Sequence, residues 1–176
     1  MTETIDAVQV GPDDWRTWRA VRLRALREDP DAFGATVAAE TGYDEALWRS
    51  RLDGRGGPAV LARAGEDVVG MGAGWTSGPG RLTVVSMWTD PAWRSRGVGG
   101  LVLRQVVRGA GDRGLQVELW VAEDDPAARR VCERHGFRAD GRTAPVRTGS
   151  SRTKSCLVLG VSVRGAAPRR PGRRSS

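Results

Sequence analysis

Cysteine and long apolar runs are scarce in this chain of 176 residues. Its two cysteines, Cys132 and Cys156, are too few for a disulfide-stapled scaffold, so we expect reduced thiols. No apolar run approaches the length of a membrane span, about 18 residues. Residues 1–10 contain acids and no basic residue, which is unlike a secretory leader. We therefore expect a cytoplasmic protein with a single hydrophobic core and no membrane partner.

Positive charge is concentrated at one end of the chain. The formal net charge is +7, and residues 164–176 contain five arginines and no acid. Without those five arginines the charge is +2, which is ordinary for a globular domain. The tail also lacks aromatic residues that could stack on bases, so we predict disorder there rather than nucleic-acid binding. The predicted organisation is one domain over residues 1–163 and a disordered tail over residues 164–176.

The spacing of apolar residues predicts strands that alternate with helices. Strands are expected at residues 5–10, 59–63, 68–75, 82–89, 115–121, near 137 and at 156–163. Helices are expected at residues 15–29, 44–52, 98–110 and 125–136. Turn-forming glycines suggest that the middle strands form an antiparallel meander, and Trp75 and Trp120 are predicted to lie in the core. A mixed α/β sheet with helices on both faces follows.

The stretch most informative for chemistry runs from Thr89 to Gly100, where a predicted strand leads into a predicted helix through glycines. The first amide N–H groups of a helix have no partner within it, so they can bind phosphate. Glycine lets the backbone approach such a ligand, and Arg94 and Arg96 add positive charge. The pattern Arg-x-x-Gly-x-Gly also occurs at residues 51–56, but no amphipathic helix follows it there. The junction at residues 89–100 is thus suited to a pyrophosphate.

This junction and a second block resemble the GNAT-type acyl-CoA N-acyltransferase superfamily. In that family an Arg/Gln-x-x-Gly-x-Gly/Ala loop binds the pyrophosphate of acetyl-CoA, and it corresponds here to Arg94, Gly97 and Gly99. The second block corresponds to Val121, Asp125, Ala128, Val131, Cys132, Gly136 and Phe137. The resemblance implies a mostly antiparallel twisted sheet of about seven strands with helices on both faces. It also implies transfer of the acetyl group of acetyl-CoA directly to a primary amine.

The resemblance further assigns the coenzyme contacts. They are Trp88, Thr89, Arg94, Ser95, Arg96, Gly97, Val98, Gly99, Gly100 and Asp125. Asp125 stands where the family has an asparagine. Cys132 stands where many members have the tyrosine that protonates the leaving thiolate. A thiol with a reference pKa near 8.5 could replace that acid, and the alternative is that Cys132 is a small core residue.

The general base is harder to place, because the fourth strand lacks the acid that some members of the family carry. Glu123 is the first candidate, since the end of the fifth strand should face the thioester. Glu118, Asp124 and Glu40 are the other candidates. A solvated surface acid is the alternative interpretation for each of these residues.

The acceptor is the partner that the sequence determines least. We expect a small-molecule amine, and a protein N-terminus or lysine is the alternative. Arg142, Arg147, Arg152 and Lys154, near the expected acceptor mouth, favour an anionic acceptor over a polycation. A non-catalytic acyl-CoA-binding module is another alternative, because the usual tyrosine is missing. A homodimer is left open, and no metal is expected.

Overall fold

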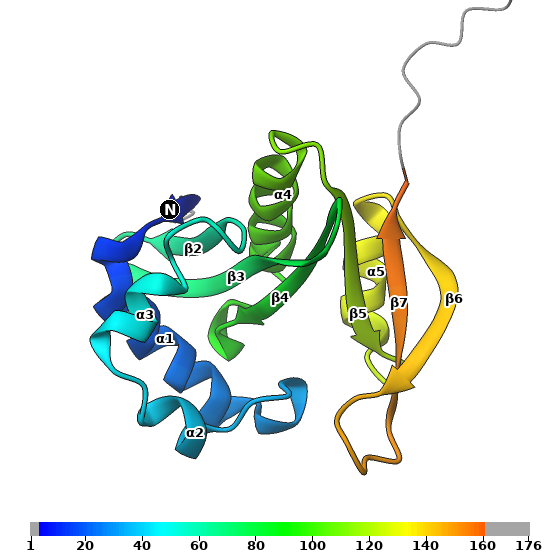
Figure 1. Ribbon diagram of the computed structural model, residues 1–176, viewed down its shortest axis with the longest axis horizontal. Coiled ribbons are helices and arrows are strands. Elements are labelled where there is room, and N and C mark those ends of the chain that lie inside the picture. The colour runs from blue at the N-terminus through cyan, green and yellow to red at the C-terminus, as the bar shows by residue number, and fades with distance from the viewer. Residues whose placement is uncertain (1–3, 161–176) are drawn as a thin grey trace, which may run out of the picture.

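The structure is a computed structural model that describes residues 4–160. Its centre is a seven-stranded sheet in the order β1-β2-β3-β4-β5-β7-β6 (Figure 1). The strands are β1 (Ile5–Val10), β2 (Ala59–Ala64), β3 (Asp67–Gly78), β4 (Arg81–Thr89), β5 (Gln116–Ala122), β6 (Phe137–Pro145) and β7 (Thr153–Leu159). The helices are α1 (Trp15–Glu28), α2 (Val37–Thr41), α3 (Glu45–Ser50), α4 (Val98–Gly111) and α5 (Pro126–Arg134), with 3-10 turns η1 (Pro12–Asp14), η2 (Pro30–Ala32) and η3 (Pro91–Trp93). The predicted mixed α/β fold is confirmed, and all neighbouring strands are antiparallel except β4 and β5.

The structure ends short of two sequence predictions. Residues 161–163 of the strand expected at 156–163 lie outside the described residues. The predicted tail at residues 164–176 also lies outside them. Within residues 4–160, no helix is both long and apolar enough to cross a membrane.

Helix α1 forms where apolar residues recur at helical spacing. Trp18, Val21 and Ala25 share one face and are buried against the sheet side of the molecule. The helix ends at Glu28, because a residue that precedes a proline is driven out of the helical region, and Asp29 precedes Pro30. The end of α1 is therefore determined locally, and it lies within one residue of the predicted end.

Strands β4 and β5 are paired over only part of their length. Their parallel pairing ends at Val84 and Leu119. Beyond these residues β4 continues to Thr89 and β5 to Ala122, and the two arms of the sheet diverge (Figure 1). A register shift against β3 and a φ of 58° at Ser86 indicate a bulge in β4 at this point. The divergence leaves one edge of β4 without a strand partner in the described chain.

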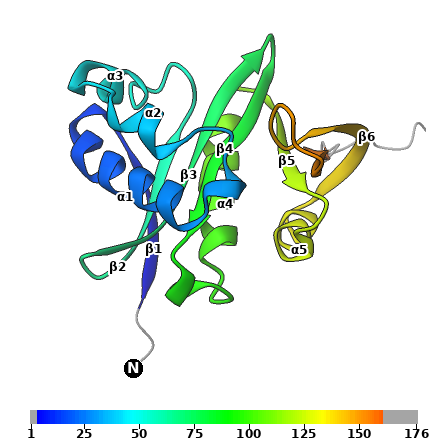
Figure 2. The same cartoon turned by 90° about the horizontal axis from the view of Figure 1, so that it is seen from below.

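Two hydrophobic cores lie on opposite faces of the sheet. The core beneath α4 and α5 includes Val60, Leu82, Val102, Leu119 and Phe137. The core beneath α1, α2 and α3 includes Trp18, Leu26, Trp48, Leu61 and Met71. Figure 2 shows these three helices against the arm formed by β1 to β4, whereas β5, β6 and β7 lie apart with α5. One face of the second arm is therefore left without a helix over it in the described chain.

Trp75 differs from its sequence prediction. Strand alternation places Trp75 on the same face as Met71 and Ala73, which belong to or pack against the core beneath α1 to α3. Its side chain is nevertheless 58% exposed, so the prediction of a core position is wrong. The spacing of apolar residues predicts which face a side chain occupies, but it does not predict whether a helix extends far enough to cover it.

Candidate active site

The junction between β4 and α4 presents free amide groups. Helix α4 begins after Gly97, whose φ is +84°. The first helical hydrogen bond there runs from the Leu101 N–H to the Gly97 carbonyl at 3.0 Å. The amides of Val98, Gly99 and Gly100 precede this bond, and the first turn holds no acidic side chain. We call this group of amides the cradle, and its chemistry suits an anion.

Two arginines flank the cradle. Arg94 donates from Nη2 to Asp29 Oδ2 at 2.5 Å and from Nε to the Thr89 carbonyl at 3.3 Å. The Arg96 guanidinium lies over the Trp93 ring, 4.9 Å from its centroid. Both cations thus lie in the turn that leads into the cradle, and the charge of each would add to the attraction for an anion there.

The glycines of the cradle and Ser95, which precedes it, have separate local roles. Ser95 has a φ of 62°, which turns the chain before the helix begins. A Cβ on Gly99 would meet only Thr89 Oγ1, at 3.6 Å, so the space over it is open. A Cβ on Gly100 would come within 2.8 Å of the His135 ring, so this position lets α4 approach the end of α5. The cradle is therefore open at Gly99 and closed by α5 at Gly100.

The end of β4 offers its backbone rather than its side chains. Trp88 is 4% exposed and lies in the core beneath α1, with the Arg24 guanidinium 4.7 Å from its ring centroid. Its backbone pairs with Met71 of β3, whereas on the β5 side strand pairing ends at Val84. An extended chain that contains amides can add to such an edge. Trp88 and Thr89 can thus contact a ligand through main-chain groups.

A pocket beside the cradle was missed by the sequence analysis. It is lined by Arg104, Gln105, Val107, Arg108 and His135. Arg104 Nη1 lies 3.3 Å from His135 Nε2, and this same ring packs on Gly100. The four-residue spacing of the two arginines on α4 was the available clue in the sequence. The pocket places two cations where a ligand bound at the cradle could carry additional negative charge.

Cys132 lies in α5 on the side that packs against the sheet. Its side chain is buried and belongs to the core beneath α4 and α5. Burial, helped by the nearby Asp125 carboxylate, raises the pKa of the thiol to about 11. The proton therefore stays on sulfur at neutral pH, and the thiol is a weak acid. Asp125 itself caps α5, since its Oδ1 accepts from the Ala128 N–H at 2.9 Å.

Glu123 lies just beyond β5 and is exposed. It accepts hydrogen bonds from Thr153 Oγ1 at 2.5 Å and from Ser155 Oγ at 3.0 Å. These two hydrogen bonds, that from Thr153 above all, lower the pKa of the Glu123 carboxyl below its ordinary value. The carboxylate is therefore ionised at neutral pH, and the two hydroxyl groups of β7 fix the orientation of the Glu123 side chain.

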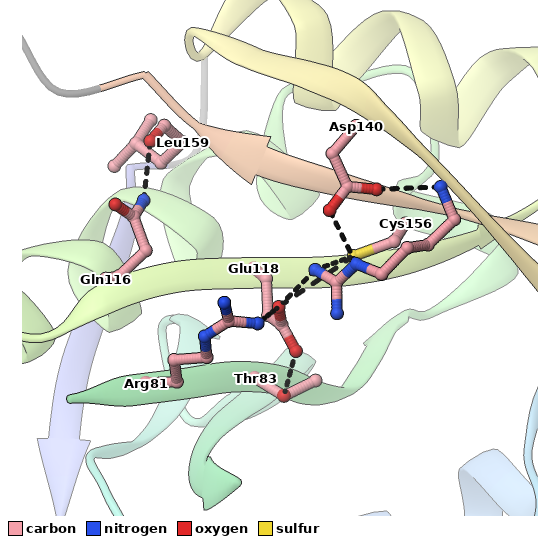
Figure 3. Close-up of polar contacts among 8 residues, drawn as sticks. Arg81, Thr83, Gln116, Glu118, Asp140, Cys156 and Leu159 are labelled. Atoms are coloured by element: carbon pink, nitrogen blue, oxygen red, sulfur yellow. Dashed lines mark hydrogen bonds and ion pairs between the residues drawn. The ribbon is translucent and has the colours of Figure 1, made fainter. Parts of the chain in front are cut away.

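Glu118 is a buried acid at the point where β4 and β5 are still paired (Figure 3). It accepts from Thr83 Oγ1 at 3.2 Å and from Arg142 Nη2 at 2.6 Å, and Arg81 Nη1 lies 3.6 Å away. The same Arg142 nitrogen lies 3.1 Å from the sulfur of Cys156. The contacts of Glu118 join β4, β5 and β6. Glu118 therefore anchors these strands to one another just before β4 and β5 diverge.

The other two acidic candidates also have arginine partners. Glu40 is 1% exposed and forms two hydrogen bonds with Arg22, at 2.9 and 3.0 Å. Asp124 forms two with Arg152, at 2.7 and 2.8 Å, and these lower the pKa of the Asp124 carboxyl. Among the four candidate acids, only Glu123 has hydroxyl groups rather than guanidinium groups as its hydrogen-bond partners in the described chain.

An ion pair that joins α1 to the turn η3, just before the cradle, was also missed by the sequence analysis. Arg24 donates to the Val68 carbonyl at 2.9 Å and pairs with Asp90 at 3.1 Å. The Asp90 N–H donates to the Val69 carbonyl at 2.9 Å, and its Oδ1 accepts from the Ala92 N–H at 2.8 Å. Asp90 thus starts the turn η3 and holds it against α1. No local pattern indicates a pair so distant in the chain.

Solved structures share this fold. A putative acetyltransferase, yncA from Salmonella typhimurium with its cofactor acetyl-CoA, matches over 93% of this chain and 97% of its own at 16% identity, with a TM-score of 0.72. The ribosomal-protein-S18-alanine N-acetyltransferase from Escherichia coli matches over 93% and 97% at 17% identity, with a TM-score of 0.66. NAA60 from Arabidopsis thaliana, in complex with a bisubstrate analogue, matches over 89% and 98% at 15% identity, with a TM-score of 0.62. At these identities the likeness is one of fold.

A family model adds evidence at the level of sequence. A search of curated proteins finds no match. The model described as the acetyltransferase (GNAT) family matches residues 18–137, which include the cradle, Glu123 and Cys132. The resemblance inferred from the two sequence blocks is confirmed, and the chain belongs to the GNAT family of acetyltransferases, which use acetyl-CoA.

Proposed function

We propose that the protein transfers the acetyl group of acetyl-CoA to the primary amine of a small molecule that carries a carboxylate. The observation that carries the coenzyme half of this proposal is the cradle, where free amides, Gly97 and two arginines lie beside the unpaired edge of β4. The amides and arginines suit the diphosphate. The backbone of Trp88 and Thr89 suits the amide-containing arm. Bound this way, the coenzyme supplies an acetyl thioester.

The acceptor half of the proposal rests on charged residues in β6, in β7 and in the connection between these two strands. Three of the four cations expected at the acceptor mouth already have carboxylate partners, namely Arg142 with Glu118 and Asp140, Arg147 with Asp31, and Arg152 with Asp124. Lys154 forms no ion pair within residues 4–160, and its Nζ lies 5.4 Å from the centroid of the Trp120 ring. An ammonium held over an aromatic ring can still bind a carboxylate. This supports an acceptor with an acidic group.

Contacts across the acceptor end favour a small molecule over a peptide. Arg147 donates to Asp31 at 2.7 Å, and Arg152 donates to the Asp31 carbonyl at 3.4 Å. These bonds tie the turn η2 to the connection between β6 and β7. A peptide chain lying between these two segments would have to break both contacts, whereas a small amine would not.

Glu123 is the carboxylate that we assign to the amine. A carboxylate with a lowered pKa is a weak base, so its role is to bind the ammonium form and pass the proton to water. We expect Glu123→Gln to lower kcat/KM for the amine by about tenfold to a hundredfold, with an unchanged Kd for CoA. Steady-state kinetics and calorimetry measure the two quantities. Glu66→Gln, in the exposed turn between β2 and β3, is the matched control.

The hydrogen bonds to Glu123 add a pH test of the same assignment. The ionised carboxylate is present above its pKa and is lost as the pH falls through it. Thr153→Val removes the hydrogen bond that contributes most to the lowered pKa, so the pKa of Glu123 should rise toward its ordinary value. The carboxyl resonance in an NMR titration should therefore shift at a higher pH than in the wild type. An unchanged titration would contradict the role given to Thr153.

Cys132 is the residue that we assign to the leaving group. As the amine forms its bond to the acetyl carbon, the bond to sulfur breaks, and the Cys132 thiol would donate a hydrogen bond to the leaving sulfur while water supplies its proton. We expect Cys132→Ala to lower kcat at least about tenfold while the Kd for CoA stays the same. Stopped-flow detection of released thiol measures the rate. An unchanged kcat would return Cys132 to a purely structural role in the core.

A thermal shift with CoA and acetyl-CoA tests the proposed function first. A ligand at a hundred times its Kd adds about 2.7 kcal/mol of stability, which raises the Tm by several degrees in a domain of this size. Adenine nucleotide is the control. Thiol release should then be measured with carboxylate-bearing amines, polyamines and peptides. Turnover confined to peptides would overturn the acceptor assignment, and coenzyme binding without turnover would favour a non-catalytic module.

A further inference from the structure

A short segment between α1 and α2 is held at both of its ends by ion pairs. We call residues 29–32, which comprise Asp29 and the turn η2, the strap. Asp29 accepts from Arg94 at the cradle at 2.5 Å, and Asp31 accepts from Arg147 in the connection between β6 and β7 at 2.7 Å. Figure 1 shows the strap and that connection at the same end of the molecule. The strap therefore lies between the coenzyme side and the acceptor side.

Arg94 already has a carboxylate partner before any coenzyme is considered. Its Nη2 bonds to Asp29, and its Nε is engaged by the Thr89 carbonyl. The Arg94 side chain is 50% exposed and that of Asp29 is 29% exposed, so a ligand can reach both. A diphosphate at the cradle would attract the Arg94 guanidinium, and the Asp29 carboxylate would repel the diphosphate.

Asp29 cannot follow Arg94 toward such a ligand, because its backbone is fixed on both sides. The Asp29 N–H donates to the Ala25 carbonyl at 2.9 Å, and its carbonyl accepts from the Ala32 N–H at 3.0 Å. The ring of Pro30 fixes its own φ and restricts Asp29 before it, and the bonds to Asp31 hold the far end of the strap. The carboxylate therefore stays in place while the longer arginine side chain moves.

We propose that Asp29 is a positioning residue that competes with the coenzyme diphosphate for Arg94. It keeps the arginine folded against α1 in the free protein and weakens coenzyme binding by the free energy of that ion pair. Coenzyme binding draws Arg94 away from Asp29, so the strap keeps a side-chain ion pair only on its acceptor side. The inference rests on the proposed function, because it requires CoA to bind at the cradle.

The test is the effect of Asp29→Asn on the Kd for CoA, measured by calorimetry. Exposed ion pairs contribute up to about 1 kcal/mol, so we expect Asp29→Asn to lower the Kd by about three- to fivefold. Glu28→Gln is the matched control, since it removes the exposed carboxylate of the preceding residue, which forms no ion pair within residues 4–160. We expect its Kd to stay within about twofold of the wild type.

Two further measurements separate competition from a general structural effect. In the Arg94→Gln background, Asp29→Asn should lower the Kd by a smaller factor, because the ion pair no longer exists and only the direct repulsion of the diphosphate by Asp29 is removed. With S-acetylpantetheine, which lacks the diphosphate, Asp29→Asn should leave kcat/KM unchanged. A Kd for CoA that is unchanged or higher in Asp29→Asn would overturn the inference, and so would an equal effect in the Arg94→Gln background. Absence of CoA binding by the wild type would instead overturn the proposed function.

Discussion

Gly97→Val should raise the Kd for CoA at least about a hundredfold. Gly97 adopts a φ of +84° immediately before α4, and a β-branched side chain is strained there. The chain would relieve that strain by rotating the backbone that presents the amides of Val98 and Gly99. Two charge-assisted hydrogen bonds are worth roughly 3 kcal/mol or more, which sets the scale of the loss. Calorimetry with CoA measures it.

The loop at residues 51–56, which carries the same Arg-x-x-Gly-x-Gly pattern, supplies a matched control. Gly54 has a φ of +79° and is exposed, and a Cβ at either Gly54 or Gly97 would have no neighbour within 4 Å. Gly54→Val should therefore cost a comparable amount of stability, about 1–3 kcal/mol, and leave the Kd for CoA unchanged. Equal losses of CoA binding in the two variants would show that backbone strain acts on the whole fold. The cradle would then have no special role.

The features predicted correctly from the sequence are local ones. The start of α4 depends on glycines and on the change from strand to helix periodicity, all within residues 89–100. The cap of α5 by Asp125 depends on an acid followed by Pro126. In each case the interacting groups are close in the chain, so their spacing carries the information. The bounds of β1, α1, β4 and α4 were predicted to within one residue for the same reason.

The features that were missed join distant segments. The pairs Asp29–Arg94 and Arg24–Asp90 depend on how α1 packs against β4, and no spacing in the sequence encodes that packing. The exposure of Trp75 depends on where the covering helices end. Sequence patterns also could not distinguish the candidate acids, because their partners are distant in the chain, such as Arg22 for Glu40 and Thr153 for Glu123. Only the three-dimensional contacts separate Glu123 from Glu40.

Replacing Glu40 with alanine should lower the free energy of unfolding by about 3–5 kcal/mol. Glu40 in α2 accepts from Nε and Nη2 of Arg22 in α1 at 3.0 and 2.9 Å. Glu40 is 1% and Arg22 is 6% exposed, and the guanidinium also lies over the Phe33 ring, 4.6 Å from its centroid. Without the carboxylate, a buried arginine would remain with no equivalent partner. Urea unfolding measures the difference.

An exposed pair of nearly identical length is the control. Arg129 and Glu133 lie on α5 with a Nε to Oε1 distance of 2.9 Å, and their side chains are 42% and 41% exposed. Glu133→Ala should cost no more than about 0.5 kcal/mol, because water replaces the partner of an exposed charge. A similar loss in Glu40→Ala and Glu133→Ala would show that burial of the Arg22–Glu40 pair has no energetic consequence.

A double variant separates the structural role of Glu40 from a catalytic one. Arg22→Met with Glu40→Leu removes both charges and keeps apolar volume, so most of the stability lost in Glu40→Ala should return. If Glu40 only joins α1 to α2, this folded variant should keep its Kd for CoA and its turnover of the amine. A variant that is stable and binds CoA but turns over no amine would identify Glu40, and not Glu123, as the acid that the reaction requires. Because stability and turnover are then measured on the same protein, a loss of one cannot be mistaken for a loss of the other.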